Sequence, residues 1–342
     1  MSAPATSMYS DTARRTAASL SLKIGRPNLE VFADTLLELA QADRQILAVT
    51  SDSRGSGKLG PFGQALPDQI VEVGIAEQNL VGIAAGLSAA GKKVFAVSPA
   101  CFLTARSLEQ IKNDIAYSDH PAKLVGISAG VSYGALGSTH HSLHDLAALR
   151  AINNIDIVVP ADNVETRAAV IAATQAQHPV YLRFGKAALY DIHDRELHYQ
   201  PRRAITVRDG VDLAFIATGE AVIHALLAAA QLQVSHGISC RVISMHTVRP
   251  LDKTAVLRAA EQCRAIVTVE EHMIHGGLGE ACAALLLEAG ARIGFKIVGI
   301  PDEYTVTGSQ ADIFRHYGIS MEGLAQTAFN VLQSIPVRRS QP

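Results

Sequence analysis

The sequence predicts an α/β protein of two doubly wound domains, the first built on a mostly parallel sheet and the second a smaller α/β domain. Short apolar, β-branched runs alternate with helical stretches along the chain. Continuous apolar strands separated by helices indicate a parallel sheet covered on both faces. At 342 residues the chain is long enough for two domains with ordinary cores.

The first domain is predicted to extend from residue 25 to residue 187. Apolar, β-branched runs between turn residues predict its strands at residues 46–50, 70–73, 93–97, 124–128, 155–159 and 180–184. Apolar residues at helical spacing predict its helices at residues 29–40, 76–90, 103–117 and 164–176.

A charged segment at residues 188–205 interrupts this alternation and is expected to be an inter-domain linker. The second domain is predicted over residues 206–335, with strands at 213–217, 241–244, 266–270 and 296–300. Its helices are expected at 221–234, 253–262, 278–289 and 321–332. Residues 1–24, rich in Ser, Thr and Ala, are expected to form a flexible N-terminal tail.

The composition excludes several classes of partner. A formal net charge of -2 gives no reason to propose nucleic acid or a membrane surface. No apolar run approaches the ~20 residues that span a bilayer. The four widely spaced cysteines favour reduced thiols in a cytoplasmic protein; they are Cys101, Cys240, Cys263 and Cys282.

One carboxylate, Glu77, stands at the start of a helix that is otherwise almost free of charge, in VEVGIAEQNLVGIAAGLSAAG. The positive end of the helix favours the ionised carboxylate, whereas burial favours the protonated acid. The apolar residues that follow Glu77 favour burial. Charge patterning alone leaves both a structural cap and a catalytic acid open.

The run GIAEQ followed by a small-residue helix resembles the pyrimidine-binding domain of thiamine-diphosphate enzymes of the transketolase type. The resemblance implies thiamine diphosphate as cofactor and Glu77 as the residue that hydrogen-bonds N1' of its aminopyrimidine. A proton shared with N1' favours the imino tautomer, whose 4' nitrogen then removes the C2 proton of the thiazolium. A carboxylate in this role must be desolvated to hold a proton near neutral pH.

The segment SPACFLTARSLEQIKN resembles the family segment whose aromatic ring stacks on the aminopyrimidine. On that match Phe102 is the stacking residue, and Arg106 is expected beside the cofactor. Stacking suits a flat heterocycle and costs little entropy. Without the resemblance, Phe102 would be read as a core residue at the start of a helix.

The histidine cluster GSTHHSLHDLA allows two interpretations. His140 and His144 have the i, i+4 spacing of a zinc pair, but no further ligand cluster lies close in sequence, and we assign no metal site to this chain. The cluster also resembles the family loop that leads into a histidine facing the substrate. That match places His140, with His141 beside it, at the ketose oxygen.

The residues upstream of this histidine depart from the family pattern. Ala135 and Leu136 stand where an acidic pair is usual, and Ser128 stands where sugar-phosphate transketolases often have a histidine. A site that lacks a hydrogen-bond partner discriminates against the substrate that needs it. The departures therefore predict the same reaction class with a different substrate, near which Ser128 would lie.

The loop TSDSRGSGKLG and the later strand YLRFGK carry the residues expected at the anionic end of the substrate. The resemblance places Asp52 near the cofactor and the subunit interface, and Ser56 and Arg183 at the substrate anion. The fork-like guanidinium groups of Arg54 and Arg183 suit phosphate, sulfonate or carboxylate. In the second domain, EEHMIHGGLGEA lacks the GxGxxG spacing, and we expect a packing and interface role there.

The resemblance covers residues 29–332, which correspond to the last two of three transketolase domains. No GDG motif, which binds the diphosphate and Mg²⁺ in that family, occurs in the sequence. The resemblance therefore implies a separate subunit that holds the diphosphate and Mg²⁺, with an α2β2 assembly. The expected reaction is transfer of a two-carbon ketol unit from an anionic ketose to an aldose.

Three alternatives remain open from the sequence. One is chemistry like that of 1-deoxyxylulose-5-phosphate synthase, which consumes pyruvate and releases CO₂. Another is the β subunit of a 2-oxoacid dehydrogenase, which also carries an acidic EQ helix. The third is a non-catalytic homologue, suggested by Ala135, Leu136 and Ser128.

Overall fold

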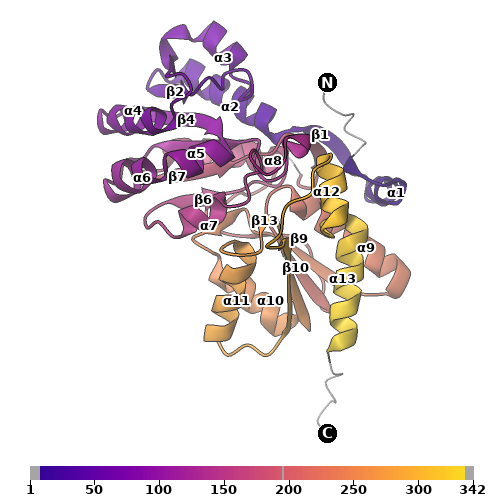
Figure 1. The fold of residues 1–342 in the computed structure, drawn as a ribbon. Coiled ribbons are helices and arrows are strands. Elements are labelled where there is room, and N and C mark those ends of the chain that lie inside the picture. The colour runs from indigo at the N-terminus through magenta and orange to yellow at the C-terminus, as the bar shows by residue number, and fades with distance from the viewer. Residues whose placement is uncertain (1–7, 195, 336–342) are drawn as a thin grey trace.

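The computed structural model describes residues 8–194 and 196–335, which form two α/β domains (Figure 1). The prediction of two α/β domains, the first on a mostly parallel sheet, is confirmed. In the described residues, no helix is both long and apolar enough to cross a membrane.

The first domain is built on a seven-stranded sheet of order β12-β6-β7-β5-β4-β2-β3, parallel except for β12. Its first six strands along the chain are β2 (Ile46–Thr50), β3 (Ile70–Glu72), β4 (Lys93–Pro99), β5 (Lys123–Ile127), β6 (Asp156–Val158) and β7 (Val180–Arg183). The buried apolar residues of these strands, such as Val49, Phe95 and Leu124, fill cores on both faces.

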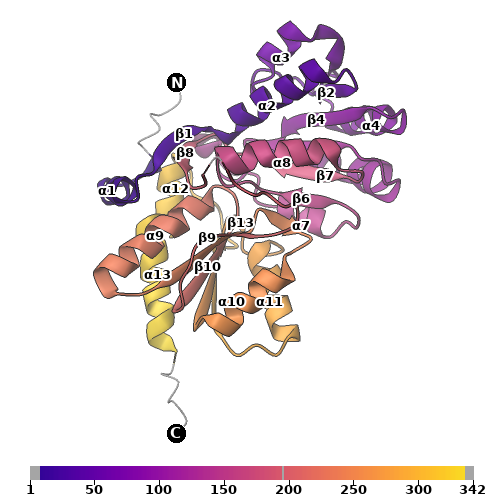
Figure 2. The same ribbon diagram turned by 180° about the vertical axis from the view of Figure 1, so that it is seen from behind.

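Helices cover both faces of this sheet (Figure 2). They are α2 (Asn28–Ala42), α3 (Gly60–Ala65), α4 (Glu77–Ala89), α5 (Ala100–Arg106), α6 (Leu108–Gln110), α7 (Asp145–Arg150) and α8 (Asn163–Gln175), with short turns η2 (Pro67–Gln69), η3 (Ile111–Tyr117) and η4 (Gly134–Leu136). The single helix predicted at residues 103–117 is divided, because the backbone leaves helical geometry at Ser107 and η3 is a π-helix.

The second domain has a five-stranded sheet of order β14-β13-β10-β11-β9, in which only β9 is antiparallel. Its strands are β9 (Ile205–Arg208), β10 (Leu213–Ala217), β11 (Cys240–Ser244), β13 (Ala265–Met273) and β14 (Gly294–Ile300). Its helices are α9 (Ala221–His236), α10 (Lys253–Gln262), α11 (Leu278–Glu288), α12 (Gln310–His316) and α13 (Met321–Ser334).

The N-terminal segment differs from the flexible tail expected there. Helix α1 (Asp11–Ser19) packs on α9 because Ala13 and Ala17, one helical turn apart, are buried in the core of the second domain. The strand β1 (Lys23–Pro27) then pairs antiparallel with β8 (Ala188–Asp191), inside the segment expected to be a linker. Residues 1–7 lie outside the described part of the chain.

The two domains share one sheet, which the sequence did not indicate. The short strand β12 (Thr247–Arg249) leaves the second domain and pairs antiparallel with β6 at the edge of the first sheet. Three residues are too few to show strand periodicity. The shared strand fixes the second domain against the first.

A buried ion pair lies at the domain interface. The Arg183 Nε donates to Asp145 Oδ2 at 2.7 Å, and the Arg183 Nη2 donates to the carbonyl oxygen of Glu271 at 2.9 Å. Both side chains of the pair are at most 5% exposed. Burial by itself would raise the pKa of Asp145, but Arg183 outweighs it and holds that pKa below its ordinary value. One guanidinium thereby ties β7, α7 and β13 together.

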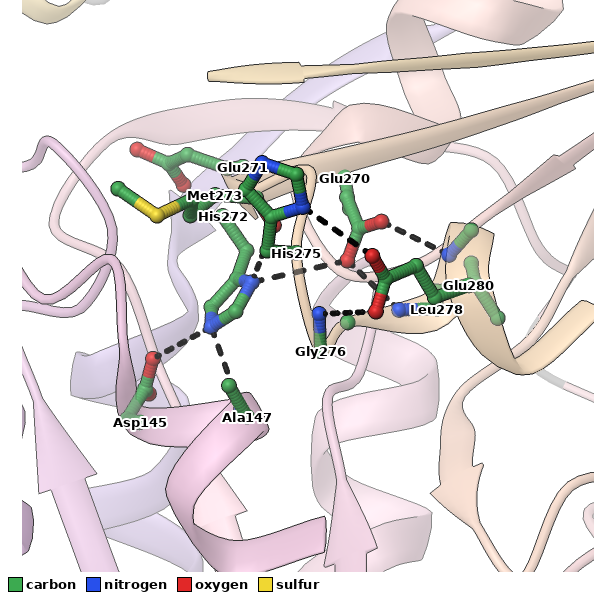
Figure 3. A network of polar contacts seen from close by, with 12 residues as sticks. Asp145, Ala147, Glu270, Glu271, His272, Met273, His275, Gly276, Leu278 and Glu280 are labelled. Atoms are coloured by element: carbon green, nitrogen blue, oxygen red, sulfur yellow. Dashed lines mark hydrogen bonds and ion pairs between the residues drawn. The ribbon is translucent and has the colours of Figure 1, made fainter. Parts of the chain in front are cut away.

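The end of β13 and the start of α11 form the polar network in Figure 3. The carboxylate of Glu270 accepts hydrogen bonds from the backbone of Leu278 at 2.7 Å and of Gly279 at 2.8 Å. A Cβ on Gly277 would meet a Glu270 oxygen at 1.9 Å. The protein's own carboxylate therefore fills the anion position at the N-terminus of α11, where a nucleotide-binding loop would hold a phosphate.

His272 in the same network is held neutral. Its Nδ1–H donates to the carbonyl oxygen of Met273 at 2.7 Å, and its Nε2 accepts from the backbone of Ala147 at 3.4 Å. Burial lowers the pKa of His272 to about 4. The contact to Ala147 at the start of α7 adds a second link between the domains, visible in Figure 3.

Two buried carboxylates share one amide donor on the other side of Arg183. Gln310 Nε2 donates to Glu220 at 3.1 Å and to Glu271 at 2.9 Å. Burial raises the pKa of Glu220 to about 8 and that of Glu271 to about 7. The Glu271 carboxylate also raises the pKa of Glu220, whereas Arg183 partly offsets the rise in both. At neutral pH this pair therefore retains bound protons.

Replacing Asp145 by Asn should lower the free energy of unfolding by about 3–5 kcal/mol, because it leaves the Arg183 charge buried without its counter-charge. Urea denaturation followed by circular dichroism measures this loss. Asp34→Asn is the matched control: Asp34 pairs with Arg26 on the surface, and its loss should cost less than about 1 kcal/mol. Equal effects of the two variants would show that the buried pair does not hold the interface.

Stability should fall as the pH rises through the pKa values of Glu220 and Glu271. The folded chain retains protons that the unfolded chain, with glutamate pKa values near 4.5, has released, so this contribution is complete below that pH and disappears above about pH 8. Glu220→Gln should flatten the decrease in melting temperature between about pH 6 and pH 9. Glu38→Gln on the surface serves as control; identical pH slopes for wild type and Glu220→Gln would contradict the assignment.

Candidate active site

The sequence places Glu77 at the first position of α4, directly after a glycine turn. Gly74 has φ +73°, and Ala76 precedes the helix without a side-chain cap. The side chain of Glu77 is only 5% exposed, so the burial expected from its apolar neighbours is confirmed. Its carboxylate accepts a hydrogen bond from Arg106 Nη1 at 2.8 Å.

Arg106 makes a second contact beside this ion pair. Its guanidinium carbon lies 4.2 Å from the centroid of the Phe102 ring. A flat, N–H-bearing group thus donates to Glu77 while it stacks on Phe102. These are the two contacts that an aminopyrimidine would need from this chain.

The acid opens onto a hollow at the surface. The hollow is lined by Ile75, Ala76, Glu77, Gln78, Asn79 and Arg106. Ile75 is 73% exposed, an unusual position for a large apolar side chain beside a buried carboxylate.

His140 lies on the other side of Phe102. The two ring centroids are 5.4 Å apart in an edge contact, and the His140 ring makes a similar contact with Tyr133 at 5.4 Å. Thr139 Oγ1 lies 2.9 Å from His140 Nδ1. The structure therefore brings together Glu77, Arg106, Phe102 and His140, which are distant in sequence.

His141 does not share the position of His140. It is buried, and its Nε2–H donates to the carbonyl oxygen of Gly134 at 2.9 Å. Burial lowers the pKa of His141, which favours the neutral ring. We therefore correct its expected substrate contact: His141 anchors the loop that carries His140.

His144 also turns away from a metal site. Its Nε2 lies 3.3 Å from Thr104 Oγ1. Within residues 8–194 and 196–335, no three His, Cys, Asp or Glu side chains are arranged to hold a metal ion.

Arg183 is not available to a substrate anion. Its guanidinium is 5% exposed and donates to Asp145, to the carbonyl oxygen of Ser142 at 3.1 Å and to that of Glu271. The expected convergence of Arg54 and Arg183 is therefore wrong. Arg54 instead lies over α3, where a Cβ on Gly63 would meet its guanidinium at 3.0 Å.

The loop after β2 lies at the carboxyl edge of the sheet. A Cβ on Gly57 would meet Val97 of β4 and Ile127 of β5, at 3.2 and 3.6 Å. The Asp52 backbone donates to Glu72 at 2.7 Å, which leaves its own side chain exposed, and the Ser56 hydroxyl donates to the carbonyl oxygen of Ser53 at 3.2 Å. Asp52 and Ser56 thus lie on the edge of the sheet where they were expected.

Two residues that sequence reasoning missed lie beside this cluster. Tyr133 contacts His140, and the ammonium of Lys186 lies 4.7 Å from the Tyr133 ring centroid. The one signal in the sequence was an aromatic residue within a loop otherwise rich in Gly, Ser and Ala.

Comparisons with known proteins agree with this arrangement. The family model "Transketolase, pyrimidine binding domain" matches residues 27–191, and "Transketolase, C-terminal domain" matches residues 202–324. One of the two subunits of the apulose-4-phosphate transketolase of Phocaeicola vulgatus is 48% identical over 303 residues, which cover 88% of this chain and 96% of that protein.

Two further proteins are similar over most of their length. The 6-deoxy-6-sulfo-D-fructose transketolase subunit SqwH of Clostridium sp. is 33% identical over 304 residues, 89% of this chain and 94% of that one. A solved split-gene transketolase, described as an inactive β4 tetramer, has a TM-score of 0.81 at 33% identity and covers 90% of this chain and 99% of that chain. The family resemblance of the sequence is thereby confirmed, and the chain belongs to the transketolase family, of which it carries the pyrimidine-binding and C-terminal domains.

Proposed function

We propose that this chain is one subunit of a split transketolase that transfers a two-carbon ketol unit from an anionic ketose to an aldose. The observation that carries the proposal is the buried carboxylate of Glu77 beside the Phe102 ring, with His140 in edge contact with the same ring. The names of the similar subunits support the reaction class.

The residues present fit the aminopyrimidine of thiamine diphosphate. The guanidinium of Arg106 already satisfies the Glu77 carboxylate and covers the Phe102 ring, so both groups accept a planar N–H donor here. When bound, thiamine diphosphate supplies the nucleophilic carbon and the electron sink for cleavage of the ketose.

Glu77 and His140 have separate roles in this proposal. The Glu77 carboxylate holds a proton against N1' of the pyrimidine, and its burial prevents water from competing for that proton. Phe102 orients the ring, and Arg106 moves from the ring face while it remains near the carboxylate. His140 donates to, or takes a proton from, an oxygen of the ketose.

A separate subunit would complete the site. We propose that it carries the diphosphate and Mg²⁺, because the two matched family models are the pyrimidine-binding and C-terminal domains. The exposed Ile75 beside Glu77 supplies an apolar contact for such a partner. We further propose an α2β2 assembly in the cytoplasm, where the four buried thiols would stay reduced.

Replacing Glu77 by Gln should lower kcat of the assembled enzyme by at least about a hundredfold, the lower range for loss of a general acid–base group. Ketol transfer from a ketose phosphate to an aldose, measured with the co-expressed partner subunit, tests this. Gel filtration checks that assembly is retained. Glu72→Gln, one strand end away, is the matched control. Turnover that survives in Glu77→Gln would remove the proposed mechanism, and CO₂ release from pyruvate would favour the synthase-like alternative.

The tagged chain should capture a partner of the diphosphate-binding type from its native lysate. Mass spectrometry of the captured protein, followed by co-expression and size measurement, should give a complex with equal numbers of both chains. Recovery of this chain alone, together with inactivity of the purified chain toward every donor, would favour the non-catalytic homologue.

A further inference from the structure

The group that binds the anionic end of the ketose can be assigned from the structure, an inference that rests on the proposed ketol transfer. Arg183 has its donors committed inside the domain interface. The anion must then be met by another cation near His140.

Lys186 lies in a suitable place for this. Its ammonium is 4.7 Å from the Tyr133 ring centroid, and the Tyr133 ring is 5.4 Å from that of His140. The ammonium is thus two ring contacts from the imidazole. A ketose with its carbonyl at His140 would extend several carbons toward this side before its anionic group.

The charges around Lys186 favour an anion. Among residues 8–194 and 196–335, no carboxylate forms an ion pair with its ammonium, although it is partly buried. Burial, and then the nearby positive charge of Lys58, lower the pKa of Lys186. Lys58 itself pairs with Glu30 at 3.1 Å. Two like charges held close together repel each other, and a bound anion removes that cost.

The loop beneath Tyr133 adds polar groups and no negative charge. Ser128 at the end of β5 is fully buried, has φ +53°, and lies beside the Tyr133 hydroxyl. Its own hydroxyl makes no well-formed hydrogen bond to any described residue. Strained backbone and unsatisfied buried hydroxyls concentrate at functional sites. Ala135 and Leu136 in the same loop carry no charge that would oppose an anion.

We infer that Lys186, assisted by Lys58 and the Tyr133 hydroxyl, binds the anionic group of the donor ketose. Ser128 positions the Tyr133 hydroxyl from below. The receptor is a pair of ammonium groups and a phenol, which suits the oxygens of a phosphate or a sulfonate. Lys186 is therefore the residue that distinguishes an anionic ketose from a neutral one.

The first test compares donors that differ by one phosphate in the enzyme assembled with its partner subunit. Lys186→Gln should raise KM for D-fructose 6-phosphate on the order of tenfold, the low end for a charge-assisted hydrogen bond at a partly exposed site, with kcat changed less than about twofold. KM for D-fructose should not change. Lys186→Arg, which retains the charge, should stay within about threefold of wild type. The matched control is Lys253→Gln on α10, remote from the first domain's loops.

The second test needs no turnover. Inorganic phosphate, methanesulfonate and acetate are titrated onto the full-length chain and followed by NMR chemical shifts. We expect phosphate to bind most tightly and Lys186→Gln to weaken it at least about fivefold, whereas Lys253→Gln leaves it unchanged. Equal binding by methanesulfonate would identify a sulfonate receptor, and preferential binding of acetate would overturn the oxyanion assignment.

The outcomes separate this inference from the proposed function. If the wild-type assembly transfers no ketol unit from any donor but Lys186→Gln still weakens phosphate, the proposed function fails and the anion site stands. If ketol transfer occurs and Lys186→Gln changes neither KM nor phosphate affinity, the anion site is wrong. A melting temperature unchanged in Lys186→Gln excludes a merely structural effect, and Lys186→Arg provides the same comparison if Lys186→Gln does not fold.

Discussion

The buried ion pair between Arg183 and Asp145 is the interaction on which the rest of the structure depends. It joins the last strand of the first domain to α7, and through the Glu271 carbonyl to the second domain. Helix α7 directly follows the loop that carries His140, and β5, next to β7 in the sheet, leads into that loop. A charge pair inside a protein is weak evidence for stability but fixes geometry, because each member is costly to leave alone. The position of His140 relative to Phe102 is therefore set partly at the domain interface.

Much of the fold could be predicted because strands buried on both faces show as continuous apolar runs. The strand expected at residues 46–50 coincides with β2, and the helix expected at 253–262 coincides with α10. Helix α1 and strand β12 could not be predicted in the same way. The first buries only a narrow stripe of Ala residues, and the second is three residues long and takes its partner from the other domain.

The site divides along a similar line. Glu77, Arg106, Phe102 and His140 belong to local motifs, and the structure brings them together as expected. Arg183 was misjudged because its partners are far away in sequence: Asp145 is 38 residues upstream and Glu271 is 88 residues downstream. Local spacing says that an arginine ends a strand, but it does not say which carboxylate has already paired with it. Tyr133 and Lys186 were missed because their relation is a ring contact with no sequence signature.

The contact of Arg106 with Glu77 also bears on the free subunit. A carboxylate that is 5% exposed and has no counter-charge would destabilise the chain before any partner arrived. Arg106 supplies that counter-charge from an adjacent helix and covers Phe102 at the same time. The chain can thus fold with its acid buried, and the guanidinium is displaced only in the assembled enzyme.

The strand β12 has a consequence for dividing the protein into separate pieces. The boundary between the domains in sequence is not their boundary in space, because residues from beyond the linker close the edge of the first sheet. A fragment that ends before β9 would expose the backbone of β6 as an open edge, a template for pairing with other chains. The two domains consequently form a single unit of expression and inheritance, and a recombination point between them would separate a strand from its sheet.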